Sequence, residues 1–270
     1  MIIMKELTQH PLTYTFDIFS NRDDVQVFVT TRQGGESQGH LATCNIGLSE
    51  QEPTATTISN RQRLCTALNI DFEKMTFQNQ VHSDRITLVD LSNAGSGNRI
   101  KAKAIANSDA LITKEKGVTL LALAADCVPI VLFDAQKKVA AAVHAGWRGS
   151  VKKIAQKTAQ RMIEEHGCNP KDILAGIGPS IGQCCYEVGD EVADEVRQSF
   201  ASAHELIVPK DGKYMLDLWK ANKQQLVEIG LLDSNIEVAQ MCTKCHHNLF
   251  FSSRYDNGKT GRFGIGITML

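Results

Sequence analysis

Residues 124–150 constrain the fold of this chain more than any other stretch. Two apolar runs, 129–134 and 139–144, flank the short polar segment 135–138, and this pattern is typical of an antiparallel β-hairpin. We therefore expect the rest of the chain to be organised around a pair of neighbouring strands.

The register of this hairpin decides which side chains meet. If Asp134 pairs with Val139, Pro129 lies opposite His144, and Cys127 shares a face of the sheet with His144 as its diagonal neighbour. Such neighbours sit roughly 7–8 Å apart at the backbone, which side chains can span to hold a metal ion or to form a thiolate–imidazole pair. A slip of one residue would destroy this arrangement. The alternatives are a plain buried cysteine and a core histidine.

Residues 145–149 follow the second run and combine two glycines, an aromatic ring and a guanidinium. Glycine lets the backbone approach another group closely. A helix is predicted over residues 150–167, with Ser150 as its N-cap and Gly167 as its stop, and a helix start offers unpaired N–H groups to an anion. This end of the hairpin is therefore predicted to be a functional site, with Arg148 beside it.

The composition is that of an ordinary globular protein of one large or two small domains: 270 residues, 43% hydrophobic, with a net charge of −1. The lack of a basic excess argues against nucleic acid as a partner. We find no signal peptide and no run of roughly 18 apolar residues, so we expect a cytoplasmic protein without a membrane segment. In the cytoplasm, the eight cysteines are expected to be thiols, metal ligands or a nucleophile rather than disulfides.

Strand-like and helix-like segments are mixed along the chain without a repeat or a composition break, which predicts an α/β (α+β) fold with mixed sheets. The other expected strands are 25–31, 77–81, 86–89, 109–113, 118–124, 173–177 and a last strand after the Gly-rich loop 252–262. The other expected helices are 53–69, 187–200 and 216–230.

His82 lies at the end of predicted strand 77–81 among polar residues, where it can be a ligand or an ordinary solvated histidine. With Cys127 and His144 it makes a set of two imidazoles and one thiolate. Three protein ligands with an open fourth position are typical of catalytic zinc, and the same set can bind copper. The sequence predicts a metal centre here without choosing the metal.

Two further motifs are weaker. Cys242, Cys245 and His246 match the C-x-x-C-H pattern of c-type haem attachment, which needs an exported protein and is not expected here. A zinc ribbon would need a second C-x-x-C, and the adjacent pair Cys184 and Cys185 does not have that spacing. Neither motif therefore adds a second predicted site.

Six motifs together resemble the YfiH-like, laccase-domain family, also called multifunctional purine nucleoside phosphorylases. They are spread from Thr30 to the C-terminus: Asn79-Gln-Val-His-Ser83, Ala125-Asp-Cys-Val-Pro-Ile130, Val143-His-Ala-Gly-Trp-Arg-Gly149, Gly176-Ile-Gly-Pro-Ser-Ile-Gly182, Cys184-Cys-Tyr-Glu-Val-Gly189 and the loop 256–262. The resemblance implies a four-layer α-β-β-α sandwich that forms a single catalytic domain over residues 1–270. The chain departs from the family's usual Ser-Tyr-Arg-Arg run at residues 252–255 and from its Pro-Cys-Cys run at Gln183.

The resemblance also implies that the two histidines and the cysteine bind zinc, and that the protein cleaves adenosine, inosine and methylthioadenosine with phosphate and deaminates adenosine. Purine nucleosides and phosphate are then the expected partners. Cys127, His144 and Arg148 are the expected catalytic residues. Phosphorolysis needs cations to hold phosphate, for which Arg148 is the first candidate, followed by Arg32 and Arg61.

Three other functions stay open. A copper polyphenol oxidase with four coppers would need many histidines, usually in H-x-H pairs, and this chain has eight histidines and no such pair. A hydrolase with Cys127 as nucleophile and His144 as base would use the same neighbours, and the family's link to peptidoglycan precursors suits such an amide cleavage. A metal-sensing or binding module is the non-enzymatic alternative.

Overall fold

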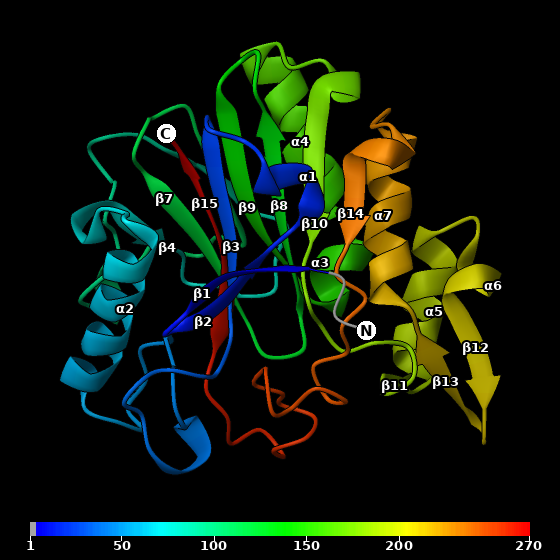
Figure 1. Ribbon diagram of the computed structural model, residues 1–270. Coiled ribbons are helices and arrows are strands. Elements are labelled where there is room, and N and C mark those ends of the chain that lie inside the picture. The colour runs from blue at the N-terminus through cyan, green and yellow to red at the C-terminus, as the bar shows by residue number, and fades with distance from the viewer. Residues whose placement is uncertain (1–3) are drawn as a thin grey trace.

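The computed structural model describes residues 4–270 and places two mixed β-sheets face to face, with helices on the outer side of each (Figure 1). Helix α2 (Thr54–Leu68) covers the outer face of the first sheet. Helices α4 (Ile154–His166) and α7 (Leu218–Glu228) cover the outer face of the second. The predicted α/β (α+β) class and the four-layer α-β-β-α sandwich are confirmed, and the described residues form a single domain.

The first sheet joins segments from both ends of the chain, because its C-terminal strand β15 lies between two earlier strands. Strand β4 pairs in parallel with β7, and the other pairings of this sheet are antiparallel. The strand order is β1 (Lys5–Gln9), β2 (Leu12–Thr15), β3 (Val25–Thr30), β15 (Phe263–Met269), β7 (Thr119–Ala124) and β4 (Met75–Phe77).

The second sheet holds the predicted hairpin at its centre. Its order is β14 (Ile236–Val238), β10 (Ile173–Ile177), β8 (Val128–Asp134), β9 (Val139–Ala145), β6 (Ala110–Thr113) and β5 (Ile86–Val89). A small third sheet stands beside it, accompanied by two helices, and the sequence analysis predicted none of its three strands. This unit contains β11 (Glu187–Val188), β13 (Lys213–Leu216), β12 (Ile207–Lys210), α5 (Asp190–Ser199) and α6 (Ala203–Leu206).

The two large sheets share one apolar interior. Along β8, Ile130 and Leu132 pack toward the helices, whereas Val131 and Phe133 pack toward the first sheet. Successive side chains of a strand point to opposite faces, so a strand buried on both faces must be apolar throughout. The uninterrupted apolar runs of the hairpin are therefore explained by its central place between the layers.

The hairpin adopts the predicted register, with Asp134 paired to Val139 and Pro129 paired to His144. The carboxylate of Asp134 accepts hydrogen bonds from the backbone N–H groups of Gln136 and Lys137, both at 2.9 Å, which fixes the turn. A one-residue slip would break these bonds and bury the wrong faces. The turn and both buried faces thus set the position of His144.

The predicted helix over residues 150–167 is wrong at its start and right at its end. Ser150 belongs to the short helix α3 (Trp147–Val151), and α4 begins only after Lys153, whose φ of 61° breaks the helix. Tertiary bonds hold Ser150 in place, because its oxygens accept hydrogen bonds from the side-chain amides of Asn222 and Gln225. Gly167 ends α4 in the left-handed conformation as predicted.

Two other boundaries differ from the prediction. Strand 77–81 ends at Phe77, because the Gln80 side chain bonds both the N–H and the C=O of Leu123 at 2.8 Å and so replaces the next backbone pair. The expected helix 187–200 begins at Asp190, since the two residues at its start pair as β11 with β13. Helix 216–230 is confirmed with Asp217 as its N-cap, although Leu216 belongs to β13.

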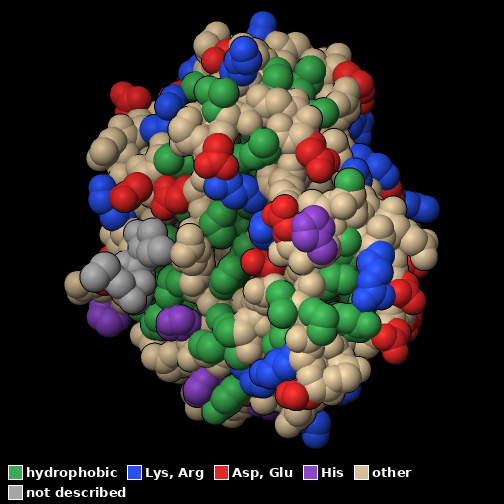
Figure 2. All heavy atoms as spheres, turned by 90° about the vertical axis from the view of Figure 1, so that its right-hand side faces the viewer, with side chains coloured by type: hydrophobic (Ala, Val, Ile, Leu, Met, Phe, Trp, Pro, Cys, Tyr) green, Lys and Arg blue, Asp and Glu red, His purple; other side chains and the backbone are tan. Residues whose placement is uncertain are grey.

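The surface carries mixed charge on the face drawn in Figure 2, where basic and acidic side chains are interspersed. This agrees with the net charge of −1. Within residues 4–270, each helix is too short or too polar to cross a bilayer.

Candidate active site and metal centre

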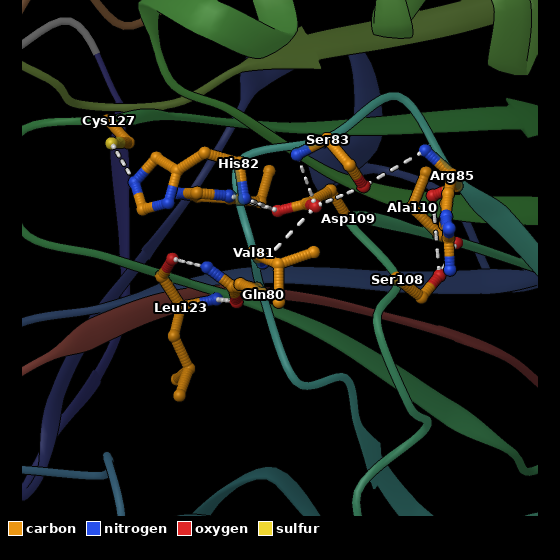
Figure 3. Close-up of polar contacts among 11 residues, drawn as sticks. Gln80, Val81, His82, Ser83, Arg85, Ser108, Asp109, Ala110, Leu123 and Cys127 are labelled. Carbon is orange, nitrogen blue, oxygen red and sulfur yellow. Dashed lines mark hydrogen bonds and ion pairs between the residues drawn. The ribbon is translucent and has the colours of Figure 1, made fainter.

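His82, Cys127 and His144 meet although they come from three separate segments. His82 lies in the loop after β4, Cys127 directly precedes β8, and His144 lies on β9. The Nε2 atom of His82 is 3.8 Å from the Sγ atom of Cys127, as Figure 3 shows, and one potential ligand atom from each residue lies within 4.8 Å of the others. The two imidazole rings are nearly perpendicular, with centroids 4.9 Å apart.

The backbone around this cluster adopts uncommon conformations that bring the side chains together. His82 has φ 59° and Asp126, next to Cys127, has φ 91°, a region that non-glycine residues seldom occupy. A Cβ atom on Gly146 would lie 3.0 Å from the Cys127 sulfur and 2.9 Å from the His82 ring. Glycine is therefore required at this position for the close approach that the sequence predicted.

Asp109 organises two of the three residues. One oxygen of its carboxylate lies 2.9 Å from Nδ1 of His144 and accepts the backbone N–H of His82 at 3.0 Å. The other accepts the N–H of Val81 at 3.2 Å and both the N–H and the hydroxyl of Ser83 at 2.7 Å (Figure 3). A carboxylate behind a ligand histidine fixes its ring and its tautomer, so Nε2 of His144 faces the metal site.

The same contacts control the charges of the site. Burial raises the pKa of Asp109, but its bonds from His144 and Ser83 outweigh this and lower it to about 2. Burial also raises the pKa of the Cys127 thiol, and the charge of His144 with hydrogen bonds from both histidines lowers it below its ordinary value. Cys127 and Asp109 in turn raise the pKa of His144 despite its burial. The cluster therefore favours a thiolate, the form that binds metals.

The donor set fits a zinc-type ion. Bond lengths of about 2.0–2.3 Å to nitrogen and sulfur place neighbouring ligands of a tetrahedral site about 3.5 Å apart. The separation of 3.8 Å between His82 and Cys127 is close to this value. All three side chains line a cavity, so a fourth position would face the open space. Copper accepts the same donors, so the geometry alone selects no metal.

The cavity has a volume of about 780 Å³, within the range of small-molecule sites. Tyr186 lines it, and so does Phe77, whose buried ring lies beneath the Arg61 guanidinium. Four basic residues line it against the single acidic residue Asp126: Arg61, Lys101, Arg254 and Arg262. This surplus of positive charge beside the metal centre favours an anionic ligand.

Arg61 is the most unusual of these cations because it is only 1% exposed. Its guanidinium donates hydrogen bonds at 2.8 Å to the carbonyl oxygens of Ile46, Gly97 and Asn98, and it stacks 3.7 Å from the ring centroid of Phe77. Burial lowers its pKa to about 9. Within residues 4–270, no carboxylate forms an ion pair with it, so an anion in the cavity would supply the missing countercharge.

The other two predicted phosphate ligands lie elsewhere. Arg32 donates hydrogen bonds at 2.9 Å to the carbonyl oxygens of Ala42 and His247, and its guanidinium packs on the ring of Phe251. Arg148 is exposed and lies over its neighbour Trp147. Neither residue is among those that line the cavity, and their predicted contact with phosphate stays a prediction.

The sequence did not reveal Asp109, Arg254 or Arg262 as members of the site. The only signal for Asp109 was an acidic residue at the start of an apolar strand, where β6 begins one residue later. Arg254 and Arg262 belong to the tail loop, whose departure from the family pattern had left the role of its arginines undefined.

Comparison with known proteins agrees with this architecture. Residues 26–270 match the family model described as multi-copper polyphenol oxidoreductase laccase. The structure of YlmD from Geobacillus stearothermophilus superposes with a TM-score of 0.93 and 35% identity, covering 100% of this chain and 99% of that one. The chain therefore belongs to the laccase-domain, YfiH-like family, as its motifs predicted.

Curated relatives carry enzyme names. "Purine nucleoside phosphorylase YlmD" of Bacillus subtilis (strain 168) is 38% identical over 251 residues, which cover 92% of this chain and 90% of that protein. "Adenosine deaminase RL5" from an unknown prokaryotic organism is 34% identical over 255 residues, which cover 93% and 96%. These lengths show that the similarity extends over nearly the whole of each protein.

Proposed function

We propose that this protein is a zinc-dependent purine nucleoside phosphorylase that acts on adenosine, inosine and methylthioadenosine and also deaminates adenosine. One observation carries the proposal: two imidazoles and a thiolate lie together in a cavity whose other charged residues are mainly cationic. The names of the relatives support the same reaction class. Free thiols at all eight cysteines support a cytoplasmic setting.

His82, Cys127 and His144 would hold the metal. When bound, zinc supplies a Lewis acid and a means of activating water at neutral pH. The contribution of the protein is orientation: Asp109 holds the ring of His144, and the backbone of Asp109 also accepts the N–H of His144 at 2.7 Å. Tyr186, which lines the cavity, suits contact with a flat purine base.

Phosphate would bind at the cationic part of the cavity. Arg61 and Arg262 are the candidates that the geometry supports, since both line the cavity and burial lowers the pKa of both guanidinium groups. We expect Arg61→Lys to raise the KM for phosphate about tenfold or more, because a lysine keeps the charge but its ammonium cannot both bond the three carbonyl oxygens and present the donors of the free Nη2 group to phosphate. Arg32→Ala and Arg148→Ala test the two predicted ligands outside the cavity, and an unchanged phosphate KM would remove either residue from the assignment.

The decisive experiment incubates the protein with adenosine, with and without phosphate, and follows adenine, inosine and ribose 1-phosphate. Phosphate-dependent release of adenine and ribose 1-phosphate supports phosphorolysis, and phosphate-independent inosine supports deamination. If adenosine is consumed neither with nor without phosphate, the proposal is overturned. Metal analysis of protein purified without added metal distinguishes zinc from copper.

A second function is favoured by one specific observation. The Cys127 thiol faces His144, whose other ring nitrogen contacts the Asp109 carboxylate at 2.9 Å, which is the order of groups in a cysteine hydrolase triad. Such an enzyme would cleave an amide, for example in a peptidoglycan precursor, without a metal. A covalent adduct on Cys127 formed during turnover would favour this function, whereas loss of turnover on chelation would count against it.

A further inference from the structure

A second group of metal-binding side chains lies apart from the proposed active site. Cys184 and Cys185 follow β10, whereas Cys242 and Cys245 follow β14, and the four sulfur atoms all lie within 4.8 Å of one another. We call this group the tetrathiolate cluster. Its members do not line the active-site cavity.

The distances within the tetrathiolate cluster match a mononuclear site. Zinc–sulfur bonds of about 2.3 Å place neighbouring sulfurs of a tetrahedral site about 3.8 Å apart. The Sγ atom of Cys245 lies 3.8 Å from that of Cys184 and 3.5 Å from that of Cys185. All four cysteines are free thiols, so the short distances are not those of a disulfide. The sulfurs also lie closer together than the several iron atoms of a cluster with bridging sulfides would allow.

The backbone around the cluster supplies hydrogen-bond donors that stabilise a thiolate. Backbone N–H groups of Gly182 and Cys245 donate hydrogen bonds to the sulfur of Cys242, which is itself buried. Such donors to a ligand sulfur are a common feature of the surroundings of thiolate metal sites. Four mutually close cysteines satisfy the ligand number of a closed zinc site, with no position left for a substrate.

The cluster also joins the two loops that support Asp126, the residue before Cys127. The backbone N–H of Ile181 donates to the carbonyl oxygen of Asp126 at 2.9 Å, and the hydroxyl of Thr243 donates to its carboxylate at 2.6 Å. Ile181 lies three residues before Cys184, and Thr243 lies directly after Cys242. Fixing the four sulfurs therefore fixes both contacts to the strained backbone at Asp126.

We infer that the tetrathiolate cluster is a second, structural metal centre that binds one zinc ion tetrahedrally and holds the cavity wall beside Cys127. The loop after β10 contributes Ile181 and Tyr186 to that wall. This ion would position the cavity wall and would take no part in the chemistry. The inference does not depend on the reaction assigned to the first centre.

The test is the zinc content of the full chain, loaded with zinc under reducing conditions and dialysed. We expect two zinc ions per wild-type chain and one in the double variant Cys184→Ser/Cys245→Ser. Both substituted residues are exposed, so serine leaves no buried cavity. The variant Cys127→Ser should also retain one ion, and Cys168→Ser, a buried cysteine outside both clusters, should retain two.

A spectroscopic measurement locates the second ion without relying on the stability of the double variant. Cobalt bound to Cys127→Ser should give the intense sulfur-to-metal absorption of a tetrahedral thiolate site, and this absorption should weaken when the exposed Cys184 is also replaced by serine, because one of four sulfur ligands is then lost. One zinc ion in the wild type that is lost in Cys127→Ser would overturn the inference. A disulfide among the four cysteines in the reduced, zinc-loaded protein, or iron in place of zinc, would overturn it as well.

Discussion

The two groups of potential ligands differ in how the fold positions them. Cys127 and His144 lie beside and on strands of the second sheet, and the backbone of His82 is held by the carboxylate of Asp109. This group opens onto a cavity, whereas the tetrathiolate cluster lies between two loops outside that cavity. The first group has three members and a buried carboxylate behind it. The second has four members and backbone donors. The proposed catalytic centre therefore combines well-anchored ligands with an open position, whereas the proposed structural centre has a closed set of ligands that joins two loops.

The largest effect is expected from removing the sulfur atom of the first group. Cys127→Ala should lower kcat/KM for adenosine phosphorolysis by roughly 10³-fold or more, because a metal that polarises the reacting group supplies several kcal/mol. Steady-state kinetics with zinc-loaded protein measures this loss, with Cys168→Ala as the matched control. Retained activity in Cys127→Ala would show that this sulfur is not part of the catalytic centre.

A smaller effect is expected from replacing the carboxylate that contacts His144 in the first group. Asp109→Asn keeps the shape of the side chain but loses the charge that orients His144, and it should weaken zinc binding at the first centre by about 10–100-fold. Competition with a chelator measures the affinity. The tetrathiolate cluster should keep its ion in this variant, and equal loss from both centres would contradict the separation between them.

A third effect is expected at Gly146, which packs against two members of the first group. Gly146→Ala would press a methyl group against the Cys127 sulfur and the His82 ring, and we expect an activity loss of about tenfold with little change in melting temperature. The matched control is Gly189→Ala, because a Cβ atom there meets nothing within 4 Å. Equal activity in the two variants would mean that the ligands tolerate displacement.

The smallest effect on catalysis is expected at the tetrathiolate cluster. Cys184→Ser should lower the melting temperature and reduce kcat only a few-fold, because the loops it joins support the cavity wall without touching the reacting atoms. Differential scanning calorimetry and kinetics on the same preparation measure both. A loss as large as that of Cys127→Ala would place the cluster in the catalytic centre.

Sequence patterns predicted the parts of the molecule that local rules determine. The hairpin register followed from a short polar turn between two apolar runs, and it was correct because both faces of these strands are buried. The site around His82, Cys127 and His144 followed from that register and from the family resemblance. The centre of the fold was therefore accessible without coordinates.

Contacts between distant segments were not accessible in this way. The expectation that Cys184 and Cys185 cannot complete a site with Cys242 and Cys245 rested on linear spacing, yet the parallel bridge between Ser180 and Cys242 brings the two loops together. Spacing rules describe ligands on one local turn and say little about pairs joined by tertiary structure. The break of the predicted helix at Lys153 has the same origin, because buried amides of α7 hold Ser150.

The turn of the central hairpin lies at the opposite end of the strands from the proposed metal ligands. Gln136, Lys137 and Lys138 are exposed there, and a strand of seven residues separates them from His144 by about 20 Å. A fluorescent label or an affinity tag attached at this tip would report on the protein, or immobilise it, while leaving the reactive end of the hairpin unperturbed.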